Sequence, residues 1–107
     1  MNKQETMIDA VKKGKQLRFM YSDKWREVSP HKVGIKYVNG VGSLRVFGMQ
    51  FDGRSHDGEL VEGKWRCFKI EDCKDVKASY RDGTFHTEET AGGPNFCMDE
   101  IIAEVSY

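Results

Sequence analysis

Cationic side chains surround a proline in residues 26–34, whose sequence is REVSPHKVG. Pro30 has no backbone N–H, so in a sheet it is confined to an edge, a strand start or a bend. A chain that bends there and re-enters a strand at Lys32 places Arg26 and His31 near one another at a rim. We therefore interpret this stretch as a candidate anion site. The alternative is a surface hairpin with solvated charges.

Further cations and aromatic rings follow downstream. Arg54 lies in a polar loop over residues 53–64, and Arg66 lies in an expected strand over residues 65–70. Arginine supplies forked donors that match phosphate oxygens, and aromatic faces stack nucleobases. The candidate residues for binding an anionic nucleotide or a single-stranded nucleic acid are Arg26, His31, Arg54, Arg66, Trp65 and Phe68. The alternatives are pairing of each arginine with a nearby carboxylate and burial of each ring in the core.

Residue types that carry catalysis are dispersed. The three histidines lie in separate segments, and none is part of a recognisable nucleophile motif. The three cysteines form no CxxC pair, and the histidines lack zinc-finger spacing. The glycines lack the strand–helix context of a phosphate loop. We therefore expect no enzyme activity, no metal and no cofactor.

The charges are unevenly distributed along a chain whose net charge is zero. Residues 1–36 hold nine basic and four acidic side chains, whereas residues 71–107 hold three basic and nine acidic ones. A basic end favours an anionic ligand. The alternative is that the two ends meet, within one chain or between subunits.

The cysteines and the absence of an apolar run indicate a compartment. We find no signal peptide, transit peptide or stretch long enough to span a membrane. An odd set of three cysteines is most simply explained by reduced thiols. These features predict a cytoplasmic protein without membrane contact.

The hydrophobic pattern predicts a single domain over residues 1–107 that is mainly β. A helix near Met7–Val11 is expected to begin with Thr6 as its cap and to end at Gly14. Alternating apolar residues predict strands over 17–21, 25–28, 33–37, 43–51 and 65–70, with a last strand to residue 80. Asn39-Gly40 predicts a type I′ hairpin, and Gly48 predicts a bulge or bend.

A second helix is expected near the C-terminus. Met98, Ile101, Ile102 and Val105 have the spacing of one apolar helical face. Such a helix docks on the domain or packs against a partner. The predicted architecture is a small, bent, antiparallel, five-stranded Sm-like barrel over about 15–80, with a tail and helix over about 84–107. An alternative function is a protein-interaction or oligomerisation subunit that uses this helix, as a homodimer or with another protein, and binds no ligand.

The order of these segments resembles the bacterial WYL-domain family. The resemblance covers about residues 6–76 and is carried by residues 7–11, 17–21, 26–34, 44–50 and 65–70. The chain departs from the family at Ser43-Leu44-Arg45, which occupies the place of the Trp-Tyr-Leu triplet. It also carries Glu71-Asp72 where a basic residue is usual.

The WYL resemblance implies an Sm-like barrel that senses a ligand or binds nucleic acid. Such domains are commonly attached to DNA-binding regulators and to phage-defence systems, and this chain shows no helix-turn-helix pattern. A regulatory module in a bacterial or phage defence context is therefore implied. The positions that match the basic pocket of the family are Arg26 and Arg66, with His31 adjoining.

Overall fold

The computed structural model describes residues 2–55, 58, 64–78 and 97–104. They form one antiparallel sheet with the strand order β4-β3-β2-β1-β5, in which β6 also pairs with β2. A single α-helix and a short 3₁₀ turn accompany the sheet. The elements are α1 (Lys3–Lys13), β1 (Leu17–Tyr21), β2 (Lys24–Val38), β3 (Val41–Gly53), β4 (Lys64–Lys69), η1 (Ile70–Asp72), β5 (Lys74–Ala78) and β6 (Glu100–Glu104).

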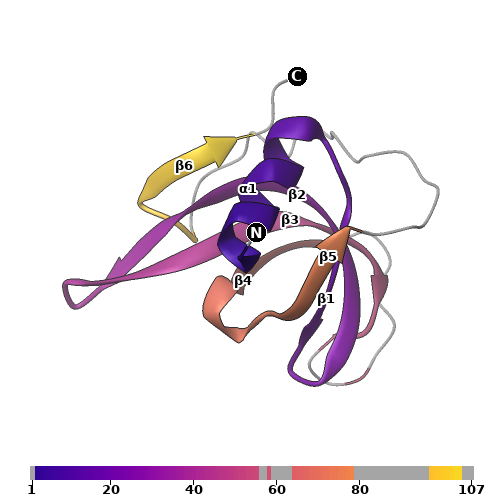
Figure 1. The fold of residues 1–107 in the computed structure, drawn as a ribbon. Coiled ribbons are helices and arrows are strands. Elements are labelled where there is room, and N and C mark those ends of the chain that lie inside the picture. Colours follow the sequence, from indigo (N-terminus) through magenta and orange to yellow (C-terminus); the bar gives the residue numbers. More distant parts are fainter. Residues whose placement is uncertain (1, 56–57, 59–63, 79–96, 105–107) are drawn as a thin grey trace.

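The long hairpin of β2 and β3 forms the centre of the sheet. Figure 1 shows its closed end projecting away from α1. The turn residues Asn39 and Gly40 have φ angles of 51° and 79°. Two consecutive positive φ angles are what a type I′ turn requires, so the hairpin prediction is confirmed.

The region around Pro30 joins two halves of β2. Before Pro30 the strand pairs with β1, and after it the strand pairs with β6. The pairing with β3 shifts register between Pro30 and Lys32, where Gly48 lies opposite Pro30. A Cβ atom on Gly48 would overlap the carbonyl oxygen of Ser29 and the Cα of Pro30. The predicted irregularity at Gly48 is therefore confirmed, although β2 is one strand and not two.

Helix α1 begins one turn earlier than predicted. The side chain of Asn2 caps it by accepting a hydrogen bond from the backbone N–H of Glu5 at 2.8 Å. Thr6 lies inside the helix, and its Oγ1 donates to the carbonyl of Asn2 at 3.0 Å. The predicted cap at Thr6 is therefore wrong. The predicted end is confirmed, because Gly14 has a φ angle of 67°.

The predicted C-terminal helix is wrong, because residues 100–104 form strand β6 on the edge of β2. Ile101 and Ile102 are 41% and 44% exposed and do not form a buried helical face. A short apolar run fits either periodicity, and here an available strand edge satisfies its backbone groups. A partner bound through a C-terminal helix is thereby ruled out in the form predicted.

The sheet is open, and the prediction of a five-stranded barrel is corrected. The described residues form six strands, and no ladder among them joins β4 to β5. Strand β2 is fifteen residues long, so β1 and β6 share one of its edges and the sheet extends there. The strand-rich antiparallel class and the N-terminal helix are confirmed. The predicted tail loop, the strand end at residue 80 and most of loop 53–64 lie outside the described residues.

Apolar side chains gather on both faces of the sheet. The larger core lies under α1 and includes Phe19, Val28 and Phe68. The smaller one contains Phe47 and Met98, with a disulfide that joins Cys67 to Cys97 across a Cα–Cα distance of 6.2 Å. The prediction of reduced thiols is therefore wrong for these two cysteines, whereas Cys73 is free and buried.

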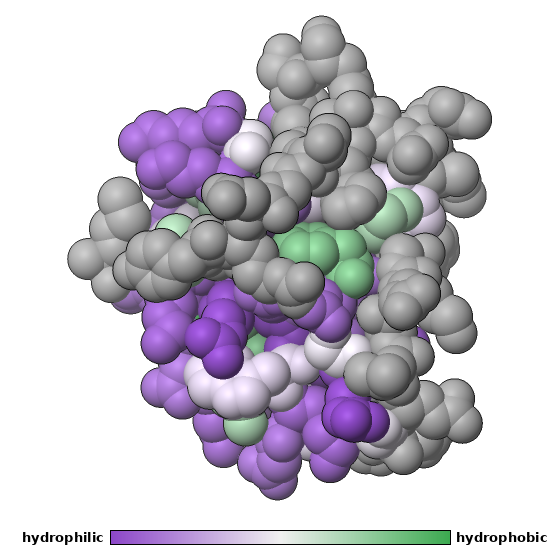
Figure 2. Space-filling model, turned by 90° about the vertical axis from the view of Figure 1, so that its right-hand side faces the viewer, coloured by the Kyte–Doolittle hydropathy of each residue, from purple (hydrophilic) through white to green (hydrophobic). Residues whose placement is uncertain are grey.

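The described surface is mostly polar. Figure 2 shows purple, hydrophilic side chains over most of the described part of one face, with a smaller apolar area among them. Within the described residues, no helix is both long enough and apolar enough to cross a membrane.

Candidate anion-binding site

The side chain of Arg26 is buried on the helix side of the sheet. Consecutive residues of a strand point to opposite faces, and Arg26 shares its face with Val28 of the larger core. Arg26 is 2% exposed, whereas the preceding Trp25 is 39% exposed. The sequence therefore places a cation where an apolar residue is usual.

Among the described residues, the groups that contact the guanidinium of Arg26 are neutral. Its Nη2 donates to the carbonyl of Tyr21 at 3.2 Å, and its Nη1 lies 3.5 Å from Oε1 of Gln50. The guanidinium carbon is 5.1 Å from the ring centroid of Tyr21 and 5.5 Å from that of Phe68. Its buried Nε has no acceptor among the described residues. Cation–π contacts offset part of the cost of burial but leave the charge unneutralised.

Arg66 lies on the same face. It is half-buried in β4, two residues before Phe68, and its buried Nε also has no acceptor in the described part of the chain. Burial lowers the pKa of Arg26, and the positive charge of Arg66 lowers it further. A buried cation and a half-buried cation therefore interact on this face of the sheet, and we call Arg26 and Arg66 the arginine pair.

The arginine pair has no carboxylate partner among the described residues, whose ion pairs all involve lysines. A buried charge that is left unpaired costs several kcal/mol. A bound oxyanion would neutralise this charge, because a guanidinium binds phosphate or carboxylate oxygens through two parallel hydrogen bonds. The arginine pair is therefore the candidate anion site, in which Arg26 is buried and Arg66 is half-buried.

His31 and Trp65 lie on the opposite face of the sheet. Nδ1 of His31 is 2.9 Å from the carbonyl oxygen of Ser29, and the His31 ring meets the Trp65 ring edge-on at 4.8 Å. Trp65 also stacks on Phe47 at 5.4 Å. These two predicted residues are therefore part of the smaller core and do not face the arginine pair.

Phe68 and Arg54 have other roles. Phe68 is 2% exposed and packs edge-on against Phe19 and Tyr21 at 5.1 and 5.0 Å, so its faces are not open to a base. Arg54 is exposed and donates from Nη1 to the carbonyl of Gly58 at 2.8 Å. The predicted rim thus separates into the arginine pair with Phe68, the His31–Trp65 contact, and an outlying Arg54.

Two residues at the arginine pair, Gln50 and Tyr21, are absent from the sequence prediction. Gln50 is fully buried and belongs to the same face of β3 as Val46. A polar residue at an apolar position of an alternating strand is the signal that identifies it. Tyr21 contributes both its ring and its backbone carbonyl, and no side-chain pattern reveals the carbonyl.

Comparison of the chain with protein-family models, with curated proteins and with solved structures gives no match. The WYL resemblance accordingly stays a prediction. Within the described residues, no three His, Cys, Asp or Glu side chains are grouped so that they could hold a metal ion.

Proposed function

We propose that this chain is a binding module for a small phosphate-bearing anion, such as a nucleotide, held by the arginine pair. The observation that supports this most directly is that a buried arginine, Arg26, and its half-buried neighbour Arg66 each have a buried Nε without an acceptor and no carboxylate partner among the described residues. Binding, and not catalysis, is the role proposed. A ligand-sensing role is also what the WYL resemblance implies.

The position of the arginine pair favours a compact anion over a polymer backbone. Arg26 is enclosed by Tyr21, Gln50 and Phe68 and is 2% exposed, so an extended polymer backbone cannot lie along it. A phosphate at the end of a nucleotide is a compact anion. Arg66 contributes the second forked donor set from β4.

Isothermal titration calorimetry with inorganic phosphate and with nucleoside monophosphates tests this proposal. Arg66→Ala is expected to weaken binding by about 1.5–3 kcal/mol, the range for hydrogen bonds to charged groups. Arg45→Ala is the matched control, since Arg45 is also a half-buried strand arginine but donates to Ser43 at 3.1 Å. Equal binding by the wild type and Arg66→Ala would refute the proposal.

A second candidate function is self-association through the projecting end of the hairpin. Tyr37, Val38 and Val41 are 43%, 54% and 69% exposed there. Apolar side chains grouped at an exposed position mark interaction surfaces. Sedimentation of the wild type and of Val41→Asp tests this candidate: a dimer that Val41→Asp dissociates supports it, and a monomeric wild type excludes it.

A further inference from the structure

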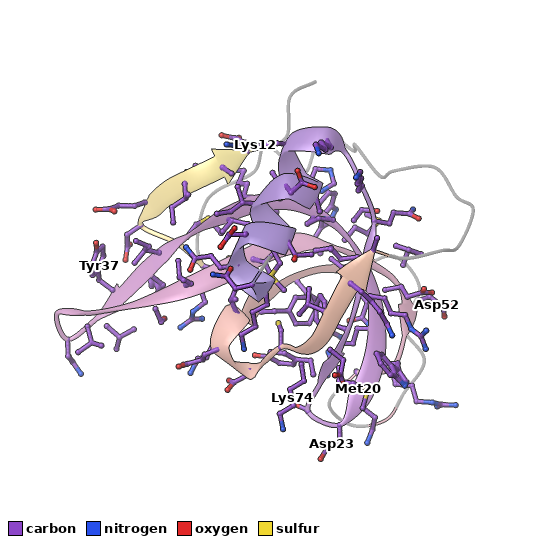
Figure 3. The ribbon with its side chains drawn as sticks, in the orientation of Figure 1. Lys12, Met20, Asp23, Tyr37, Asp52 and Lys74 are labelled. Carbon is purple, nitrogen blue, oxygen red and sulfur yellow. A yellow bond between two sulfur atoms is a disulfide. The ribbon has the colours of Figure 1, made fainter. Side chains whose placement is uncertain are left out.

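Trp25 is the most exposed large apolar residue of an array of mostly charged side chains, some exposed and some half-buried or buried, on the outer face of β5, β1, β2 and β3. The pairing register aligns Lys77, Arg18, Glu27 and Asp52 in one row across these four strands. Lys74, Met20 and Trp25 form the next row. Figure 3 shows Lys74, Met20 and Asp52 at the same end of the molecule, away from Lys12.

Cations occupy the β5–β1 side of this array. The guanidinium carbon of Arg18 is 4.2 Å from the centroid of the Trp25 ring, and Nζ of Lys77 is 5.7 Å from it. The register of β5 shifts between Lys77 and Lys74, and Asp75 between them has a φ angle of 53°. A bulge re-aims neighbouring side chains, so both lysines face the side on which Trp25 lies.

Carboxylates occupy the β2–β3 side. Glu27 and Asp52 line a cavity of about 340 Å³ together with Trp25, Arg18 and Gly53. Both carboxylates take part in other contacts of the chain, and an ionised carboxylate has about four acceptor sites, so each has capacity for a further donor. The cavity therefore holds both carboxylates beside the indole ring, together with Arg18, which lies over that ring.

We propose that this face binds single-stranded nucleic acid, with a base that carries an exocyclic amino group in the cavity beside Trp25. The base stacks on the face of the Trp25 ring that Arg18 does not cover, Asp52, the more exposed carboxylate, accepts from its amino group with Glu27 behind it, and Arg18 and Lys77 hold the adjoining phosphates. Base stacking on aromatic rings and acidic recognition of the cytosine amino group are general modes. Three strand spacings of about 4.8 Å separate β5 from β3, a span that accommodates a nucleotide from phosphate to base edge.

This site is separate from the arginine pair. Trp25 and Arg26 are consecutive in β2 and project to opposite faces of the sheet, one exposed and the other buried. A substitution of Trp25 therefore keeps the residues of the arginine pair, and Arg66→Ala keeps the residues of the array around Trp25. Each site can be lost without the other.

Fluorescence anisotropy of labelled short oligo-dC and oligo-dT, titrated with the full chain at low and moderate salt, tests the proposal. Oligo-dC is expected to bind more tightly than oligo-dT, because thymine lacks the amino group. Trp25→Ala should weaken oligo-dC binding at least about tenfold, whereas Trp25→Phe should retain most of it. Asp52→Asn should reduce the difference between the two oligonucleotides.

Two controls separate this site from others. Lys12→Ala removes an exposed cation of α1 far from the array and should bind oligo-dC like the wild type, and competition by inorganic phosphate reports any part of the binding that depends on the arginine pair. Circular dichroism confirms that each variant is folded. Absence of oligonucleotide binding at low salt, or equal binding by the wild type and Trp25→Ala, would overturn the proposal.

Discussion

The guanidinium of Arg26 and the side-chain amide of Gln50 meet across β2 and β3, with Nη1 3.5 Å from Oε1. Nε2 of Gln50 donates to the carbonyls of Asp52 and Arg54, both at 3.3 Å, which directs its oxygen toward Arg26. The acceptor that Arg26 meets is thus a fixed neutral amide. Its positive charge stays unneutralised by the described residues.

Replacing this amide with a carboxylate should give the guanidinium of Arg26 a negatively charged partner within the protein. Gln50→Glu is expected to weaken phosphate binding, because the new carboxylate pairs with Arg26 in place of the ligand. The gain in the free energy of unfolding at neutral pH should be smaller than the roughly 1.5–3 kcal/mol typical of a hydrogen bond to a charged group, because the second carboxylate oxygen faces the carbonyls of Asp52 and Arg54 to which Gln50 donates. The gain should disappear as the pH falls below the ordinary pKa of a glutamate, since the paired carboxyl has a lowered pKa. Urea denaturation and calorimetry measure both effects, and lower stability with unchanged phosphate binding would contradict them.

The disulfide between Cys67 and Cys97 should stabilise the position of β6. The two cysteines are 30 residues apart, and closing a loop of that length contributes about 3–4 kcal/mol by the chain-entropy estimate. The paired variant Cys67→Ser with Cys97→Ser is expected to lose about that much in urea denaturation. Cys73→Ser, which removes the free thiol, is the control for cysteine loss itself. An unchanged midpoint in the double variant would show that the bond does not constrain the fold.

Cys73 should be unreactive in the folded protein. Burial raises the pKa of its thiol from 9.0 to about 12, and only the thiolate reacts with thiol reagents. Ellman's reagent at mildly alkaline pH is expected to modify no thiol in the native protein and one after unfolding. Because the pKa is raised in the folded state, the contribution of Cys73 to stability is present below pH 9 and is lost as the pH rises toward 12. Rapid modification of the native protein would contradict this.

Asp99 should titrate below the ordinary range of an aspartate. Its Oδ2 accepts from the backbone N–H of Tyr37 at 2.8 Å, and this bond, followed by the charge of Lys36, lowers the pKa of Asp99. A lowered pKa means that its contribution to holding β6 is present above 3.8 and is lost as the pH falls through the folded-state value. The amide chemical shift of Tyr37 in an NMR titration reports this midpoint, and Asp99→Asn removes the transition. A midpoint at or above 3.8 would disprove the assignment.

Local sequence signals predicted those elements whose causes are local. The positive φ angles of Asn39-Gly40 and Gly14 and the alternation over residues 17–21 each depend on a few neighbouring residues, and the structure has all of them. The prediction of a helix for the C-terminal segment is wrong, because the conformation of this segment depends on the edge of β2, about 65 residues away in sequence. The Cys67–Cys97 disulfide was missed for the same reason, since it requires this strand to lie across the sheet.

The candidate site shows the same division. The sequence predicts an anion site that includes Arg26 and Arg66, and these two side chains are neighbours on one face of the sheet. Their burial was not predicted, because the sequence places both in strands that could equally expose them. His31 and Trp65 were grouped with them by proximity in sequence, but the register at Pro30 and the alternation of β4 direct both to the other face.

Thermal unfolding of the wild type and of Arg26→Met, each with and without inorganic phosphate, tests the central claim most directly. Replacing a buried charge with an apolar side chain of similar size is often neutral or stabilising, so ligand-free Arg26→Met is expected to unfold at or above the wild-type temperature. Phosphate should raise the unfolding temperature of the wild type and leave that of Arg26→Met unchanged. Equal phosphate shifts in both proteins, or no shift in the wild type, would contradict the assignment of Arg26 to an anion site.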